Sequence, residues 1–256
     1  MNIIISGAGG FMGREVAKLA EKGYQGVTAI AGVDPVAVGD AFSFACCKSF
    51  EELEQNHPEL VKSADMLVDF SNHTATGALT AFAVRNNIPL VLATTGHTED
   101  ELALISKASE SIPLFFASNY SIGVALLVQL AKTAAAALPD AEIEIVEIHH
   151  DRKIDAPSGT ALTLAKAVQD VRPGSKIVTG RSGLCKREPE DIGISSVRMG
   201  NVAGIHEVMI GTQNQTRTLK HEAHSRALFA EGALVAAAFL KDKQPGLYNM
   251  DNLMNA

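Results

Sequence analysis

Residues 147–161 gather side chains that can bind an anion and transfer a proton; they read Glu-Ile-His-His-Asp-Arg-Lys-Ile-Asp-Ala-Pro-Ser-Gly-Thr-Ala. Histidine suits proton donation because its ordinary pKa lies near neutral pH. Lys153 follows His149 and His150 closely, and its ammonium group can pair with a carboxylate. The segment therefore predicts a site that holds a small dianion and gives it a proton.

The second half of this segment predicts the start of a helix. Pro157 favours a first helical turn, which Ser158 or Asp155 can cap. Gly159 and Thr160 then lie in that turn, where backbone N–H groups bind a carboxylate. The alternative is a surface loop and a capped helix whose charges only face solvent.

A strand must position the histidines. Residues 141–145 alternate polar and apolar side chains, as a half-exposed strand does. Two apolar residues adjoin at Val146, which suggests a bulge that re-aims the residues after it. Successive side chains of a strand point to opposite faces, so His149 and His150 cannot share one pocket if the strand continues. We expect one to act and the other to support it.

A second motif opens the chain. Residues 1–34 predict a βαβ unit: a buried apolar strand, a glycine-rich turn, a helix, and a second strand that ends at Asp34. In such turns glycines allow the tight bend, the approach of a pyrophosphate and the packing of helix on strand. Gly7, Gly10 and Gly13 form a variant of the usual spacing. The turn predicts a dinucleotide site at a helix N-terminus.

Asp34 bears on the choice of cofactor. A carboxylate about 20 residues beyond the glycines can bind ribose hydroxyls. It would repel a 2′-phosphate, and no Lys or Arg stands between Lys22 and Lys48 to compensate. We therefore expect NADH to be preferred over NADPH. The alternative is an ordinary glycine-rich turn with a strand-capping aspartate.

Alternating strands and helices continue as far as residue 121. Segments 66–71, 89–93 and 112–117 each predict a buried strand that ends in polar residues. Ligands of parallel sheets bind beyond the carboxyl ends of the strands. The polar ends are therefore candidate walls for nicotinamide and substrate, unless they only cap the following helices.

The second half of the chain has a different pattern. An apolar helix is expected over residues 124–138, an exposed loop over 179–191, and a final helix over 227–240 that returns to the first domain. The expected strands, which read as an antiparallel block, are 194–198, 206–211 and 216–222. The change of pattern predicts a second domain.

Composition narrows the function classes. The 256 residues are 46% hydrophobic and 20% charged, and no segment reaches the roughly 20 apolar residues of a membrane span. A net charge of −7 argues against broad binding to nucleic acid or to an anionic membrane. Three cysteines fit a reducing compartment, so we expect a cytoplasmic protein.

A metal site is another use for histidines. The possible ligands are His149, His150, His206, His221 and His224. No Cys-rich or His-Glu-x-x-His spacing occurs, and hydride chemistry needs no metal. We expect no metal.

Taken together, the motifs resemble those of 4-hydroxy-tetrahydrodipicolinate reductases, formerly called dihydrodipicolinate reductases, along the whole chain. The motifs are segment 147–161, Gly-Ala-Gly-Gly-Phe-Met-Gly-Arg (7–14), Asp-Phe-Ser (69–71), Thr-Thr-Gly (94–96), Asn-Tyr-Ser-Ile-Gly-Val (119–124) and Ser-Arg (225–226). Segment 147–161 is highly specific, whereas the glycine turn alone is not.

The resemblance implies an α/β fold with two domains. A Rossmann-type parallel-sheet domain, residues 1–120 and 226–256, would bind the dinucleotide. An α+β domain with a mixed or antiparallel sheet, residues 121–225, would bind the substrate and build a homotetramer. The implied reaction is the NAD(P)H-dependent reduction of 4-hydroxy-tetrahydrodipicolinate, via dihydrodipicolinate, to tetrahydrodipicolinate in the diaminopimelate route to lysine. The substrate is thus a small dicarboxylate.

The resemblance also implies residue roles. His149 would donate the proton, and Lys153 would bind and polarise the substrate. The residues expected to hold a substrate carboxylate are His150, Ser158, Gly159 and Thr160. Those expected around the cofactor are Gly7, Ala8, Gly10, Phe11, Met12, Gly13, Asp34, Phe70, Ser71, Ala93, Thr94, Thr95, Gly96, Ser118, Asn119, Tyr120 and Arg226.

The chain departs from the family pattern at two places. Ile205 stands where many members carry glutamate, and Pro35 follows Asp34 where some members place an arginine. Three alternatives stay open: another Rossmann reductase or dehydrogenase, such as an amino-acid dehydrogenase; a non-catalytic dinucleotide sensor; and a family member that has lost activity.

Overall fold

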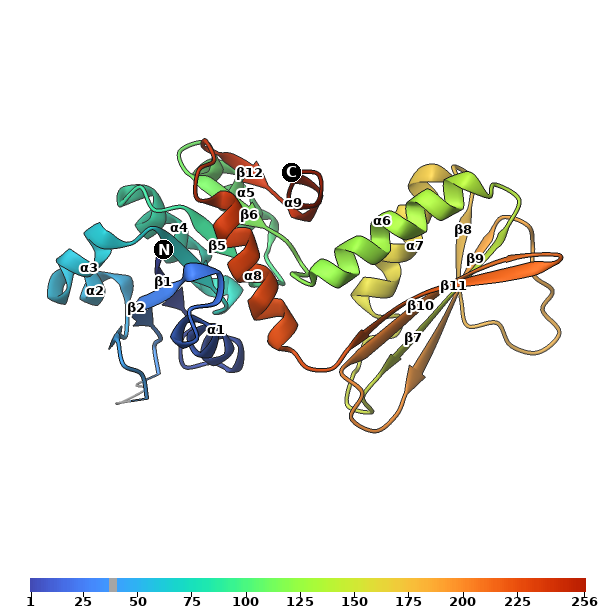
Figure 1. Cartoon of the computed structure of the whole chain (residues 1–256), viewed down its shortest axis with the longest axis horizontal. Coiled ribbons are helices and arrows are strands. Elements are labelled where there is room, and N and C mark those ends of the chain that lie inside the picture. Colours follow the sequence, from blue (N-terminus) through green and yellow to red (C-terminus); the bar gives the residue numbers. More distant parts are fainter. Residues whose placement is uncertain (37–40) are drawn as a thin grey trace. The chain divides into compact units, whose positions relative to one another are not determined.

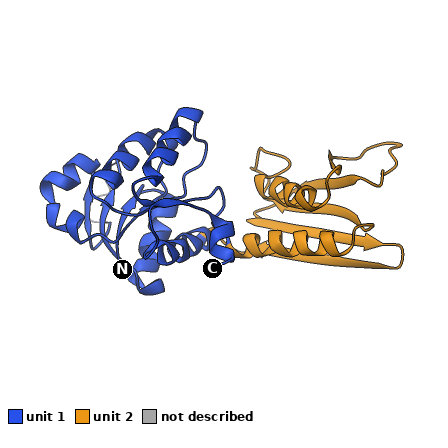
Figure 2. Ribbon diagram, turned by 90° about the horizontal axis from the view of Figure 1, so that it is seen from above, with its two compact units in different colours: residues 1–121, 227–256 blue, residues 122–226 orange. Residues whose placement is uncertain are grey.

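The computed structural model describes residues 1–36 and 41–256, which fold into two compact units (Figure 2). Unit 1 comprises Met1–Ser121 and Ala227–Ala256, and unit 2 comprises Ile122–Arg226. The chain crosses from one unit to the other twice, after Ser121 and after Arg226. These boundaries lie one residue from the expected ones.

Unit 1 is built on a seven-stranded sheet whose pairings are all parallel, in the order β12-β6-β5-β4-β1-β2-β3 (Figure 1). The strands are β1 (Asn2–Ser6), β2 (Thr28–Val33), β3 (Ala45–Cys47), β4 (Met66–Asp69), β5 (Leu90–Leu92), β6 (Pro113–Phe116) and β12 (Gly246–Tyr248). The chain winds outward in both directions from β1 and β4. Dinucleotides bind at such a reversal of strand order, beyond the carboxyl ends of the strands.

Helices cover both faces of this sheet, which explains its continuous apolar strands. Ile3 and Ile5 of β1 pack toward α1 and α8, whereas Ile4 packs toward α2, α4 and α5. All three isoleucines are fully buried. The helices of unit 1 are α1 (Phe11–Glu21), α2 (Phe50–Asn56), α3 (Pro58–Ser63), α4 (Thr76–Arg85), α5 (Glu99–Ser109), α8 (Ala227–Leu240) and α9 (Met250–Met254), with 3-10 turns at Tyr24–Gly26 and His73–Ala75.

Unit 2 is a five-stranded mixed sheet with two helices packed on one face (Figure 1). Its order is β11-β10-β7-β9-β8. The elements are α6 (Ile122–Ala137), β7 (Glu142–His149), α7 (Gly159–Val171), β8 (Lys176–Thr179), β9 (Asp191–Arg198), β10 (Gly204–Thr212) and β11 (Gln215–Ala223). The apolar core lies between the sheet and the two helices and includes Ile143, Ile145, Leu164 and Val208. The predicted fold class, a Rossmann-type unit plus an α+β unit, is confirmed.

One expectation for unit 2 is wrong. The strands after residue 190 do not form an antiparallel block, because β9 pairs with β7 and β8 in parallel, and β7 separates it from β10. Only β10 has antiparallel neighbours on both sides, namely β7 and β11. The central place of β7 puts residues 147–149 beside both β9 and β10.

Within the described parts of the chain, no helix is long and apolar enough to span a membrane.

Candidate active site

β7 carries the first two residues of the site on one face. The strand alternates without interruption, and its pairings with β9 and β10 keep register through Val146, so the expected bulge is absent. A regular strand places residues two apart on the same side. Glu147 and His149 therefore both face the helices, where Glu147 is fully buried and His149 is 8% exposed. His150 lies just beyond the end of the strand, so strand alternation does not determine the direction of its side chain.

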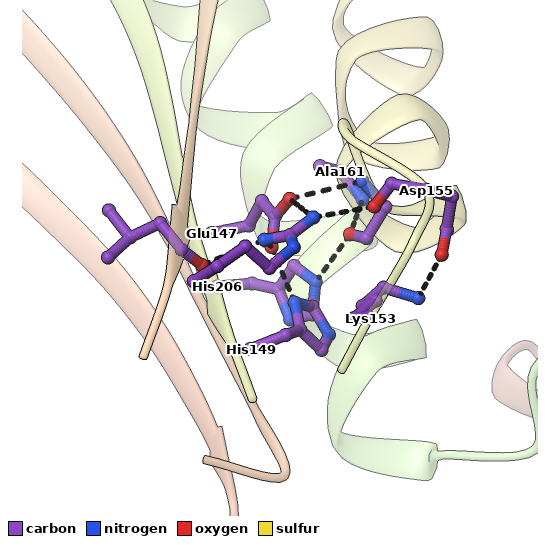
Figure 3. A network of polar contacts seen from close by, with 9 residues as sticks. Glu147, His149, Lys153, Asp155, Ala161 and His206 are labelled. Atoms are coloured by element: carbon purple, nitrogen blue, oxygen red, sulfur yellow. Dashed lines mark hydrogen bonds and ion pairs between the residues drawn. The ribbon is translucent and has the colours of Figure 1, made fainter. Parts of the chain in front are cut away.

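Glu147 joins His149 to Arg198, and Figure 3 shows the side chains of Glu147 and His149. The His149 Nδ1 lies 2.5 Å from Glu147 Oε2. Arg198, at the end of β9, donates from Nη1 to Oε2 at 2.9 Å and from Nη2 to Oε1 at 2.8 Å. Such paired hydrogen bonds between arginine and carboxylate are strong and fix geometry. Arg198 thus neutralises and orients a buried carboxylate that touches His149.

The same carboxylate reaches the start of α7. The backbone N–H of Ser158 donates to Glu147 Oε1 at 3.2 Å. Ser158, rather than Asp155, caps α7, because its Oγ accepts the N–H of Ala161 at 3.2 Å. Its hydroxyl also lies 3.1 Å from Nε2 of His206, whose ring packs edge-on against His149 with 5.1 Å between centroids. One polar network therefore links the histidine to the helix start.

Lowered pKa values leave two groups of this network in different charge states. Burial acts to raise the pKa of Glu147, but hydrogen bonds from Arg198, Ser196 and His149 outweigh it and bring the pKa to about 2. Burial lowers the pKa of His206 to about 4, and the nearby His149 acts in the same direction. Glu147 is therefore anionic and His206 neutral at neutral pH.

Lys153 and His150 flank the strand end. Lys153 Nζ lies 2.7 Å from Asp155 Oδ1, and the lysine side chain is 23% exposed. Partial burial lowers the pKa of His150, with further lowering by the charges of Arg152 and Arg226. Arg226 is thus close to His150 in unit 2, although the sequence assigns it to the cofactor domain.

The first turn of α7 is open. Apart from its chain neighbours and the backbone of its own helix, a Cβ atom at Gly159 would meet no atom of the described residues within 4 Å, so space adjoins the helix start there. Thr160 follows in the same turn and is partly exposed. The helix dipole and the N-terminal N–H groups favour an anion at this position. The geometry brings His149, Lys153 and the α7 start into one part of unit 2 (Figure 3).

In unit 1 the glycine turn fits a dinucleotide. Gly7 has a φ of 76°, and a Cβ there would lie 2.6 Å from the Phe70 carbonyl oxygen. A Cβ at Gly13 would lie 2.1 Å from the Gly7 carbonyl oxygen, so glycine alone lets α1 approach the turn. α1 begins after Gly10, whose lack of a side chain leaves room for an anion at the helix start. Ala8 is buried, Met12 packs on the core, and Phe11 is 61% exposed beside the turn.

Asp34 lies at the end of β2 and holds this turn. Its Oδ2 accepts the N–H of Gly9 at 2.8 Å, and its Oδ1 accepts the N–H of Val36 at 2.9 Å. A carboxylate has about four lone-pair positions, so each oxygen can accept a further hydrogen bond. Asp34, which the sequence predicts to bind the ribose of a cofactor, therefore lies directly beside the glycine turn.

The ends of β4, β5 and β6 hold the remaining predicted residues. Asp69 Oδ1 accepts the hydroxyl of Ser71 at 2.5 Å, and its Oδ2 accepts that of Thr94 at 2.6 Å. Burial raises the pKa of Asp69, although these hydrogen bonds oppose the shift. Tyr120 is buried and donates to the carbonyl of Leu92 at 2.9 Å. The other predicted residues at these ends are Phe70, Ala93, Thr95, Gly96, Ser118 and Asn119.

Two models of one protein family match the chain. The model described as "Dihydrodipicolinate reductase, N-terminus" matches residues 1–120, and the one described as "Dihydrodipicolinate reductase, C-terminus" matches residues 123–254. The chain belongs to the dihydrodipicolinate reductase family. This confirms the resemblance that the sequence motifs carry.

Similar members of the dihydrodipicolinate reductase family match over nearly their full length. A 4-hydroxy-tetrahydrodipicolinate reductase of Caldanaerobacter subterraneus subsp. tengcongensis is 41% identical over 99% of this chain and 98% of its own. One from Akkermansia muciniphila is 43% identical over 89% and 96%. The structure of a dipicolinate-bound dihydrodipicolinate reductase from Paenisporosarcina sp. TG-14 matches with a TM-score of 0.79 and 26% identity, over 97% of each chain.

Four polar residues of this reductase fold escape prediction from the sequence: Glu147, Arg198, His206 and Asp69. Strand alternation puts Glu147 on the face of His149 with or without a bulge at Val146, but the sequence does not show that the two side chains are in contact. Arg198 lies on β9 and His206 on β10. No local sequence pattern predicts that these two strands pair with β7. Among the described residues, no group of three or more His, Cys, Asp and Glu side chains is placed to hold a metal ion.

Proposed function

We propose that this chain reduces 4-hydroxy-tetrahydrodipicolinate, via dihydrodipicolinate, to tetrahydrodipicolinate with NAD(P)H, in the diaminopimelate route to lysine. Family membership over the whole chain supports the reaction class. The observation that carries the proposal is the buried histidine beside a lysine and an open helix start, in a chain that also holds a dinucleotide turn. These are the groups that reduction and protonation of a small dicarboxylate require.

When bound, the reduced nicotinamide supplies the hydride. The residues of unit 1 proposed to bind the cofactor are the glycine turn for the pyrophosphate, Asp34 for the ribose and the polar strand ends for the nicotinamide. In unit 2, Lys153 holds one substrate carboxylate and polarises the ring, while the start of α7 with His150 holds the other. His149 gives a proton to the carbon beside the reduced one. Positioning of this kind contributes several kcal/mol, and proton donation about 10²–10⁴-fold in rate.

The activity is tested by mixing the protein with NADH and freshly made 4-hydroxy-tetrahydrodipicolinate and following the near-ultraviolet absorbance of NADH. We expect His149→Gln to lower kcat by about 10²-fold or more with little change in NADH binding. Lys153→Ala should lower kcat and raise KM. His57→Gln and Lys166→Ala, which alter surface residues away from the network, serve as matched controls. Unchanged kinetics in both site variants would overturn the assignment.

NADH is the proposed preferred cofactor over NADPH. Asp34 presents a carboxylate beside the turn, and a 2′-phosphate placed there would meet its negative charge. We expect kcat/KM to be higher with NADH at low salt, and Asp34→Asn to narrow the difference by weakening the repulsion. A strong preference of the unaltered protein for NADPH would contradict this proposal.

A homotetramer built through the sheet of unit 2 is proposed from the family resemblance. The face of this sheet opposite α6 and α7 is only partly buried in the single chain: Ile205, Glu207 and Val146 lie there with intermediate exposure. Light scattering after gel filtration measures the solution mass, and a monomer at working concentration would contradict the proposal. We also propose a cytoplasmic location, which the three cysteines with free thiols support.

A further inference from the structure

Hydrogen-bond donors surround both oxygens of Glu147. Its Oε1 faces the N–H of Ser158 and the Nη2 of Arg198, and its Oε2 faces the Nη1 of Arg198 and the Nδ1 of His149. Ser196 is a further donor to this carboxylate, so none of the four lone-pair positions of the ionised group lacks a donor. A fully buried carboxylate held in this way cannot turn to another partner, because any turn would break hydrogen bonds that no water replaces.

The protonation of the His149 ring follows from this arrangement. An ionised carboxylate only accepts hydrogen bonds, so the ring nitrogen that faces it must carry the hydrogen. Nδ1 faces Glu147, and Nε2 is therefore the nitrogen left to face a substrate. Gly204 lies beside Nε2, and a Cβ there would be only 3.1 Å from it, so glycine keeps a side chain from crowding this nitrogen. A buried carboxylate performs the same service for the catalytic histidine of serine proteases.

We propose that Glu147 is a positioning residue that holds His149 with its Nδ1 protonated, so that the proton given to the substrate leaves from Nε2. The protonated ring loses its Nε2 hydrogen to the substrate carbon and returns to the neutral Nδ1–H form, ready to take another proton from solvent. Because Glu147 also binds the N–H of Ser158, it fixes this nitrogen relative to the α7 start that receives a carboxylate. This role for Glu147 in turnover rests on the proposed function.

The unaltered protein gives the direct test. Nitrogen NMR of histidine-labelled protein reports which ring nitrogen is protonated, and the His149 signal is assigned by its loss in His149→Gln. The spectrum is recorded at a pH where the ring is neutral; the charged and titratable groups around it are Glu147, Arg198, Lys153, His150 and His206. We expect the Nδ1–H form. A dominant Nε2–H form would overturn the proposal, and this readout requires no catalytic activity.

The variant Glu147→Gln sharpens the test. If its amide oxygen replaces Oε1 toward Ser158 and the Nη2 of Arg198, the NH₂ group faces Nδ1 and also the Nη1 of Arg198, so one of the two hydrogen bonds to Arg198 is lost. An NH₂ group donates, so Nδ1 must then accept, and the neutral ring should switch to the Nε2–H form. We expect kcat to fall by about 10²-fold while KM rises less, because the helix start keeps its partner.

Glu144→Gln is the matched control. Glu144 lies on the same strand and pairs with Arg181 at 2.8 Å, but alternation puts it on the opposite face from His149. This variant should keep both the Nδ1–H form and kcat. An unchanged ring form together with an unchanged kcat in Glu147→Gln would overturn the proposal. If Glu147→Gln does not fold, the unaltered protein still decides. If the protein shows the Nδ1–H form but no reductase activity, the proposed function is contradicted, whereas the positioning of His149 by Glu147 is still supported.

Discussion

At the scale of single residues, the site depends on two buried groups, one of which is charged and one neutral. Glu147 is anionic because Arg198 and two other donors outweigh its burial, whereas His206 is neutral because burial penalises its cation. A cationic His206 would compete for the negative charge of Glu147 with the protonated His149 ring that packs against it. A neutral His206 leaves His149 and Arg198 as the groups whose positive charge Glu147 stabilises.

This charge state predicts how stability depends on pH. His206 has a pKa of about 4 in the folded protein against an ordinary 6.5, so between these values only the unfolded chain takes up the proton. Folding stability should therefore fall as the pH drops from 6.5 to 4, by about 3 kcal/mol from this group. Glu147 acts at lower pH, because its stabilisation is lost from its ordinary value of 4.5 downward.

The variant His206→Gln removes the titrating group. We expect its free energy of unfolding, measured with urea at fixed protein concentration, to change less between pH 6.5 and 4.5 than that of the unaltered protein. His57→Gln, at the surface of unit 1, should keep the original slope. A slope in His206→Gln equal to the original would show that His206 does not contribute.

Ile205 shows why one family departure leaves this network intact. The buried positions of β10 alternate through Gly204, His206 and Val208, so Ile205 points to the opposite face of the sheet. There it lies across from Ile148 of β7, which also faces away from the network. Replacement of the glutamate found in many members therefore changes the outer face of unit 2 and no contact of His149.

At the scale of elements, the sequence predicts what local periodicity encodes. The helix over residues 227–240 has the expected bounds, and the strand, turn and helix at the N-terminus follow in the expected order. Strands β3 and β12 have three residues each, too few for a period to show, and they exist because parallel neighbours extend the sheet. β8 is four residues long and is defined by its pairing with β9 in the same way.

For the candidate site, too, the sequence predicts what lies close together along the chain. His149, Lys153 and the helix start lie within one short segment, so spacing alone joins them. Glu147 belongs to the same segment and alternation puts it on the face of His149, but spacing does not show that its carboxylate contacts the ring. In the structure Val146 and Ile148 lie on the outer face of the sheet, where both side chains are partly buried. Arg198 lies 51 residues from Glu147, and only the central place of β7 brings them together.

At the scale of the whole molecule, a two-unit enzyme depends on the segments that carry the chain between units. The segment before the first crossing and the segment after the second are in contact within unit 1. Tyr120 stands just before the first crossing, and α8 begins with the second. Gly232 of α8 packs so closely on Tyr120 that a Cβ would lie 1.7 Å from its carbonyl oxygen. Glycine is therefore required for α8 to lie against this segment.

Gly232→Ala should force the two segments apart. Because the obstacle is backbone rather than a flexible side chain, we expect overpacking to cost about 1–3 kcal/mol and to lower the melting temperature. Displacement of Tyr120 and its neighbour Asn119 should also weaken NADH binding and lower kcat, since both are proposed to line the nicotinamide end. Gly77→Ala is the control, because a Cβ there meets only a side-chain carbon at 3.9 Å and alanine favours the helix. Equal melting temperatures and kinetics for the two variants would show that the close packing at Gly232 does not hold the crossing segments in place.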